Sequence, residues 1–198
     1  YYTQYNLGIK GIASILNGLV MFQMVGMLLI PLLVKKFKKS HVLILGMLIA
    51  AIGQLLIPLA GHSLILLSVV WSIASIGTGI SVSMPFAMLS DTVDYGEWKN
   101  GIRASGFLTA IGSSFAIKIG SGLGGWAPSM ILNHVGYHAG SAQSSATLSA
   151  IRFCISYLPA IFFIIGALIM VLYIRYEAKE TRIKAELQER RATILNNN

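Results

Sequence analysis

The chain has 198 residues, of which 55% are hydrophobic and 11% are charged, and its mean hydropathy is +0.71. Soluble globular domains carry about 25% charged residues, so this composition excludes an ordinary soluble domain. Fifteen Lys and Arg residues against seven Asp and Glu residues give a formal charge of +8, which fits nucleic acid, an anionic membrane surface or the sidedness of a multi-pass protein.

Apolar runs long enough to cross a membrane follow one another along the chain. A hydrocarbon core of about 30 Å needs roughly 20 helical residues at about 1.5 Å per residue. Short polar segments separate the runs, and a charged tail (175–198) follows the last one. The sequence therefore predicts an all-α protein, a polytopic transmembrane helical bundle. Its five spans are expected at about 11–34, 41–60, 64–89, 104–133 and 148–174.

The positions of lysine and arginine predict which side of the membrane each loop faces, because basic loops stay in the cytoplasm. Four lysines lie in 35–39, Lys99 and Arg103 follow the third run, and six basic residues lie in 175–191. The alternate breaks at 61–63 and 134–147 contain no Lys or Arg. We therefore expect a multi-pass protein of the cell membrane with its amino end outside and a cytoplasmic tail. This sidedness explains the positive charge without nucleic acid.

The first residues suggest a piece of a longer protein. The chain begins with Tyr1 and no initiator Met, and an odd number of spans beginning outside calls for at least one preceding span. We expect residues 1–5 to be the outer end of that span. The single cysteine, Cys154, lies in an apolar run, so we expect a small core residue and no disulfide.

The charged tail has the spacing of a helix. Glu180 with Lys184 and Glu186 with Arg190 are favourable i,i+4 pairs, which predicts a helix at the cytoplasmic surface. Two interpretations stay open, namely a solvated tail drawn to anionic lipid and a regulatory docking segment.

Lys118 is the residue of the apolar runs that most needs an explanation. It lies 15 residues after Arg103, roughly 22 Å from the cytoplasmic surface in a helix, and an ammonium group there costs about 3 to more than 10 kcal/mol. None of the runs contains Asp or Glu, so a charged partner must lie elsewhere in the protein or on a substrate. We expect Lys118 to face a wet cavity. The alternative is a lysine that reaches the surface from a shorter helix.

Acidic residues cluster after the third run. Asp91 and Asp94 are three residues apart and share one face if the helix continues. They can pair with Arg103 or with basic groups of another domain, as the breakable salt bridges of a cytoplasmic gate. A solvated charge run at a helix end is the alternative.

The stretch 91–103, Asp-Thr-Val-Asp-Tyr-Gly-Glu-Trp-Lys-Asn-Gly-Ile-Arg, precedes Lys118-Ile-Gly-Ser-Gly and then Gly136-Tyr137. This arrangement resembles the glycoside-pentoside-hexuronide:cation symporter family, whose members have twelve spans in two six-helix bundles of the major facilitator type. The resemblance implies that the chain is the carboxy-terminal half of such a transporter. Residues 1–5 would close span seven, and spans eight to twelve would follow.

The resemblance also implies a function. Such a protein couples uptake of a glycoside, pentoside or hexuronide to Na⁺ or H⁺ by alternating access. Lys118 matches a lysine near the sugar pathway, and Asp91, Asp94 and Arg103 match charged contacts between the bundles. The coupling ion would be bound mainly by the missing amino-terminal six-helix bundle. The expected partners are that bundle, the sugar and membrane lipid, with no cofactor, no catalytic residue and no protein-bound metal in this chain.

Two hypotheses from other classes stay open. Asp91, Asp94 and Glu97 could hold a metal ion for phosphoryl chemistry in a membrane enzyme, since carboxylates suit Mg²⁺, although no His joins them. A non-catalytic membrane subunit is the other alternative.

Overall fold

The structure is a computed structural model that describes residues 1–8, 11–101 and 105–196. All regular elements among these residues are helices. The α-helices are α1 (Ile12–Leu19), α2 (Phe22–Val34), α3 (Lys39–Leu56), α4 (Leu64–Asn100), α5 (Ser105–Thr109), α6 (Ala116–His134), α7 (Ser145–Arg152), α8 (Leu158–Glu177) and α9 (Glu180–Asn196). The shorter elements are η1 (Tyr2–Asn6), η2 (Ile57–Ala60), η3 (Ala110–Phe115) and η4 (Phe153–Tyr157).

Five helical stretches of the described residues are long and apolar enough to cross a membrane, judged by length and composition. Several combine two or three consecutive elements, as α5, η3 and α6 do. The stretches are Ile12–Val34, Lys39–Ala60, Leu64–Asn100, Ser105–His134 and Ser145–Arg175. The prediction of an all-α, polytopic transmembrane protein is confirmed.

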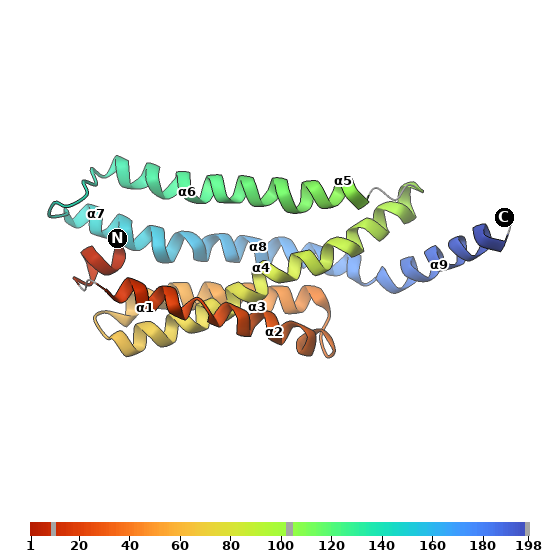
Figure 1. Ribbon diagram of the computed structural model, residues 1–198, viewed down its shortest axis with the longest axis horizontal. Helices are drawn as coiled ribbons and strands as arrows, with labels where there is room; N and C mark the ends of the chain where they lie inside the picture. Colours follow the sequence, from red (N-terminus) through yellow and green to blue (C-terminus); the bar gives the residue numbers. More distant parts are fainter. Residues whose placement is uncertain (9–10, 102–104, 197–198) are drawn as a thin grey trace.

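The stretches run side by side, so that the molecule has two ends (Figure 1). Residues 35–38, the last turns of α4 and helix α9 lie at one end, which we call the lysine-rich end. Residues 61–63 and 135–144 lie at the other, the lysine-poor end. Helices α2, α3 and α4 pack together, α8 packs on α3, and the α5–α6 stretch runs along the opposite edge (Figure 1).

Glycines let α4 approach its neighbours closely. A Cβ atom at Gly77 would lie 2.4 Å from the backbone nitrogen of Ala50 in α3, and one at Gly79 would lie 2.1 Å from the carbonyl oxygen of Gln23 in α2. Small residues allow this contact between backbones, which drives helix association where lipid replaces water. Helix α4 is therefore the centre around which α2 and α3 pack.

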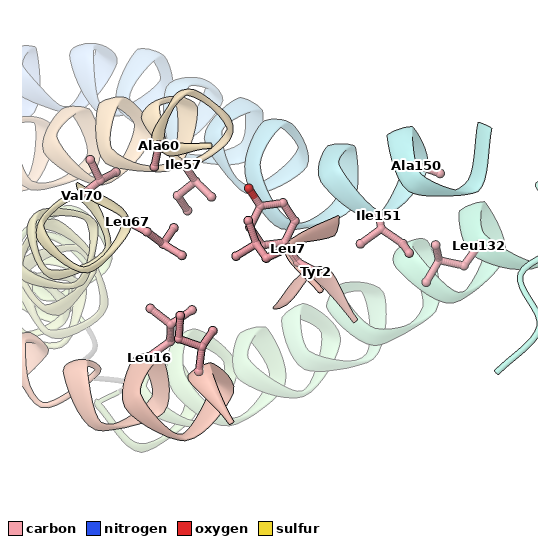
Figure 2. Packing of buried hydrophobic residues seen from close by; sticks show 11 residues of the cluster. Tyr2, Leu7, Leu16, Ile57, Ala60, Leu67, Val70, Leu132, Ala150 and Ile151 are labelled. Carbon is pink, nitrogen blue, oxygen red and sulfur yellow. The ribbon is translucent and has the colours of Figure 1, made fainter. Parts of the chain in front are cut away.

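A cluster of buried apolar side chains lies near the lysine-poor end (Figure 2). Its side chains come from segments far apart in the sequence, so the cluster joins the first residues of the chain to α4, α6 and α7. Its members are Tyr2, Leu7, Ile12, Leu16, Ile57, Ala60, Leu67, Val70, Leu132, Ala150 and Ile151.

Helix α4 is longer than the sequence prediction, which ended it near residue 89. It has 37 residues, or about 55 Å at 1.5 Å per residue, so it exceeds a hydrocarbon core of about 30 Å. Gly96 does not interrupt the helix, and Gly101 ends it with a left-handed φ of 72°. The acidic stretch 91–97 therefore lies on helix rather than in a loop, at the lysine-rich end.

Candidate functional site

Lys118 is the third residue of α6 and directly follows the π-helical turn η3. It lies 13 residues from Ser105, about 20 Å along the stretch, and its side chain is exposed on the described part of the chain. π-helical turns inside α-helices are frequent at functional sites. All seven acidic residues of the sequence lie in 91–97 and 177–189, near the lysine-rich end, so none lies beside Lys118. Residues 1–198 therefore offer Lys118 no acidic side chain as a partner.

Asp91 is the centre of a charged cluster at the lysine-rich end. Its carboxylate accepts from Lys39 Nζ at 2.6 Å and from Lys184 Nζ at 3.1 Å, while its side chain is only 3% exposed. Glu180 also binds Lys184 and lies 3.6 Å from Lys39 Nζ. The cluster thus joins the first turn of α3, the last turns of α4 and the first turn of α9. These partners of Asp91 lie within the chain, 52 and 93 residues away in sequence.

A second acidic side chain reaches the same turn of α3. Glu177, at the end of α8, accepts from the backbone N–H of Ser40 at 3.3 Å and from its hydroxyl group. Both residues are buried. A carboxylate at a helix N-terminus satisfies free N–H groups and interacts favourably with the helix dipole. Glu177 therefore caps α3 and fixes α8 to it.

Helix α9 docks on the extended end of α4, which agrees with the docking part of the second interpretation of the tail. Ile183 and Leu187 are buried at 2% and 4% exposure. The indole N–H of Trp98 donates to Glu186 at 2.6 Å, and Arg190 donates to the Trp98 carbonyl oxygen at 3.1 Å. One face of α9 is therefore bound to the rest of the chain, while side chains such as Gln188 stay exposed.

The two ion pairs predicted within the tail have different outcomes. Glu180 and Lys184 pair as expected. Glu186 binds Arg182 at 2.7 Å instead of Arg190, because Arg190 is turned toward α4. Arg190 still acts favourably on Glu186 through its charge, as expected, although its hydrogen bond goes to the Trp98 carbonyl oxygen.

Docking of α9 is expected to weaken in acid. Hydrogen bonds from Trp98 and Arg182 lower the pKa of Glu186 below its ordinary value of 4.5. A lowered pKa favours the charged carboxylate, so this stabilisation is fully present above pH 4.5 and is lost as the pH falls through the lower value of the folded state. A nitroxide label at the exposed Gln188 of the full-length protein should become more mobile over this range.

The matched control is Glu186→Gln, which removes the titrating group. We expect its label to be mobile at every pH, including neutral pH. Equal, low mobility of the label in both proteins across the whole titration would show that Glu186 does not hold α9.

The structure places the remaining predicted residues as follows. Arg103 lies outside the described residues. Asp94 and Glu97 are half-buried on α4 and each has an interaction partner. Within 1–8, 11–101 and 105–196, no three His, Cys, Asp or Glu side chains are placed to hold a metal ion. The hypothesis of a metal enzyme thus lacks its ligand set, because Asp91 is bound by two lysines.

Sequence comparison identifies the protein family of the chain. Residues 1–175 match the family model described as MFS/sugar transport protein. The chain belongs to this family of the major facilitator superfamily. The resemblance to glycoside-pentoside-hexuronide:cation symporters, which are sugar transporters of this type, is thereby confirmed.

Curated relatives agree with this assignment. The chain is 34% identical over 194 residues to an isoprimeverose transporter of Lactiplantibacillus pentosus, which covers 97% of the chain and 40% of the relative. It is 37% identical to a putative sulfoquinovose importer of Escherichia coli (strain K12), over 96% of the chain and 40% of the relative. A glucuronide carrier protein homolog of Escherichia coli (strain K12) is 31% identical, over 96% and 42%. The chain spans about two fifths of the length of these relatives.

Proposed function

We propose that the full-length protein is a secondary active transporter that couples sugar uptake to Na⁺ or H⁺ by alternating access, and that residues 1–198 form its carboxy-terminal part. Membership of the MFS/sugar transport protein family supports the proposal, as do relatives named for isoprimeverose and sulfoquinovose transport. The protein is a transporter and not an enzyme. It lies in the cell membrane with residue 1 of this chain on the outer side and helix α9 in the cytoplasm, as the basic loops indicate.

The depth of Lys118 within an apolar stretch is the observation that supports the proposed sugar site. Its ammonium group lies about 20 Å along an apolar stretch, next to a π-helical turn and far from the seven acidic residues. Charged groups at this depth line substrate or ion pathways. Two relatives are named for sulfoquinovose and for a glucuronide, which are sugars with an anionic group. We assign Lys118 to the sugar pathway, where it donates to a carboxylate, a sulfonate or a hydroxyl group.

The gate is proposed at the lysine-rich end, from Asp91, Asp94 and Arg103. Asp91 holds Lys39 and Lys184 at the end of α4, so its charge is balanced within this bundle. When the two bundles close at this end, basic groups of the amino-terminal bundle would replace these lysines as partners of the acidic residues or would join them. The coupling ion binds mainly in the remaining part of the protein.

Replacement of Lys118 by alanine tests the site. Because one hydrogen bond to a charged group contributes about 1.5–3 kcal/mol, we expect the initial uptake rate of an anionic sugar to fall about tenfold or more. Uptake is measured in vesicles that contain the full-length protein. Lys179→Ala, which removes an exposed lysine just before α9, should transport at the wild-type rate. Wild-type uptake by Lys118→Ala would remove Lys118 from the pathway.

A further inference from the structure

Arg152 is a second basic residue within an apolar stretch, at the lysine-poor end. It lies eight residues after Ser144, the N-cap of α7, or about 12 Å along the stretch, and its side chain is exposed. No acidic side chain can balance its charge locally, because all seven Asp and Glu residues lie in 91–97 and 177–189, near the other end. A guanidinium group in this position needs an anion from outside the chain.

Arg152 also lines a groove between α6 and the α7–η4 segment. The groove has a volume of about 550 Å³, and its lining combines one cation and two hydroxyl groups with apolar side chains. The aromatic rings of Phe153 and Tyr157 stack within it, with centroids 6.3 Å apart, and both are more than one third exposed. The lining residues are Ile131, Ser149, Ala150, Arg152, Phe153 and Tyr157.

The order of these groups along the helix matches the layers of a phospholipid. Helix α7 begins at the lysine-poor surface, and side chains tilt toward the N-terminus of their helix, so Arg152 extends toward that surface. Tyr157 lies five residues, or about 7 Å, deeper along the span. The guanidinium thus lies nearest the phosphate level, with aromatic rings at the level of the ester groups and upper acyl chains.

We propose that this groove binds one anionic phospholipid from the leaflet at the lysine-poor end, with Arg152 holding its phosphate. The planar guanidinium forms paired hydrogen bonds with a phosphate group, which a lysine ammonium does less well. This end of the chain has no carboxylate that could bind the ammonium group of a lipid headgroup. The groove therefore favours headgroups without an ammonium group. Phosphatidylglycerol is therefore favoured over phosphatidylethanolamine.

The test uses full-length protein in phosphatidylcholine vesicles with a trace of phosphatidylglycerol that carries a photoreactive diazirine in one acyl chain. After illumination, the labelled residues are mapped by peptide mass spectrometry. We expect labelling at 153–157, the segment at the level of the upper acyl chains, that unlabelled phosphatidylglycerol displaces and phosphatidylethanolamine does not. Arg152→Gln should reduce this labelling about tenfold or more, because it removes the charge-assisted hydrogen bonds to the phosphate.

Two variants serve as controls. Arg152→Lys keeps the charge and should retain part of the labelling, which separates loss of binding from loss of folding. Arg175→Gln removes an exposed arginine at the opposite end of the same span and should label like the wild type. Unchanged labelling in Arg152→Gln, or equal competition by both lipids, would overturn the proposal. Displacement by inorganic phosphate would instead assign the groove to a soluble phosphate compound and overturn the lipid assignment.

Discussion

Replacing Gly77 by alanine is expected to lower the free energy of unfolding of the full-length protein by about 3 kcal/mol, the upper part of the range for an overpacked core. The new methyl group would lie 2.4 Å from the backbone nitrogen of Ala50 and 2.7 Å from the carbonyl oxygen of Gly46. Both obstacles belong to the backbone of α3, so the clash is relieved only when two helices move apart. The loss is measured by thermal or denaturant unfolding of the purified protein.

Gly166→Ala is the matched control, because it makes the same change where α8 packs on α3. The methyl group there would meet only the flexible end of the Met47 side chain, at 3.2 Å. We expect a change in unfolding free energy well below 1 kcal/mol, since a methionine side chain can adjust. Equal stability of the Gly77→Ala and Gly166→Ala proteins would contradict the close packing of α3 and α4.

Replacing Asp91 by alanine is the second large change, with an expected loss of about 2 kcal/mol in unfolding free energy. Removal of one partner from a buried ion pair costs about 3–5 kcal/mol. Lys39 and Lys184 are 24% and 42% exposed in their side chains, so water compensates part of the lost interaction. The variant should also loosen α9, because Lys184 loses one of its two acidic partners.

Lys38→Ala provides the comparison for this change. Lys38 neighbours Lys39 but is exposed at the start of α3, so its replacement should alter unfolding by a few tenths of a kcal/mol. Unfolding is measured together with the mobility of a label at Gln188. An Asp91→Ala protein as stable as Lys38→Ala would show that the cluster does not hold the lysine-rich end together.

Hydropathy was sufficient to predict the all-α membrane fold, because about 20 consecutive apolar residues leave few alternatives to a span. The continuation of α4 to Asn100 was considered only as a condition for Asp91 and Asp94 to share a face, since an apolar run reports where the hydrocarbon ends and not where the helix ends. Two residues of this segment are informative in retrospect. The indole of Trp98 binds the tail, and Gly101 terminates the helix.

The charged cluster shows a different limit of sequence reasoning. The i,i+4 pair of Glu180 with Lys184 is local and could be predicted. The contacts of Asp91 with Lys39 and of Glu177 with Ser40 join residues 52 and 137 positions apart, and no periodicity in one sequence reports such pairs. The groove at Arg152 was missed for the same reason, because it depends on how α6 and α7 come together.

The most direct test of the proposed transport is uptake of labelled sugars into vesicles that contain the full-length protein, with and without an imposed Na⁺ or H⁺ gradient. The panel should include a neutral glycoside, a glucuronide and sulfoquinovose. We predict that at least one sugar accumulates above its external concentration only when one of the two gradients is present. Equilibration of every sugar to the same level with and without a gradient would contradict symport, and no uptake of any of them would contradict sugar transport itself.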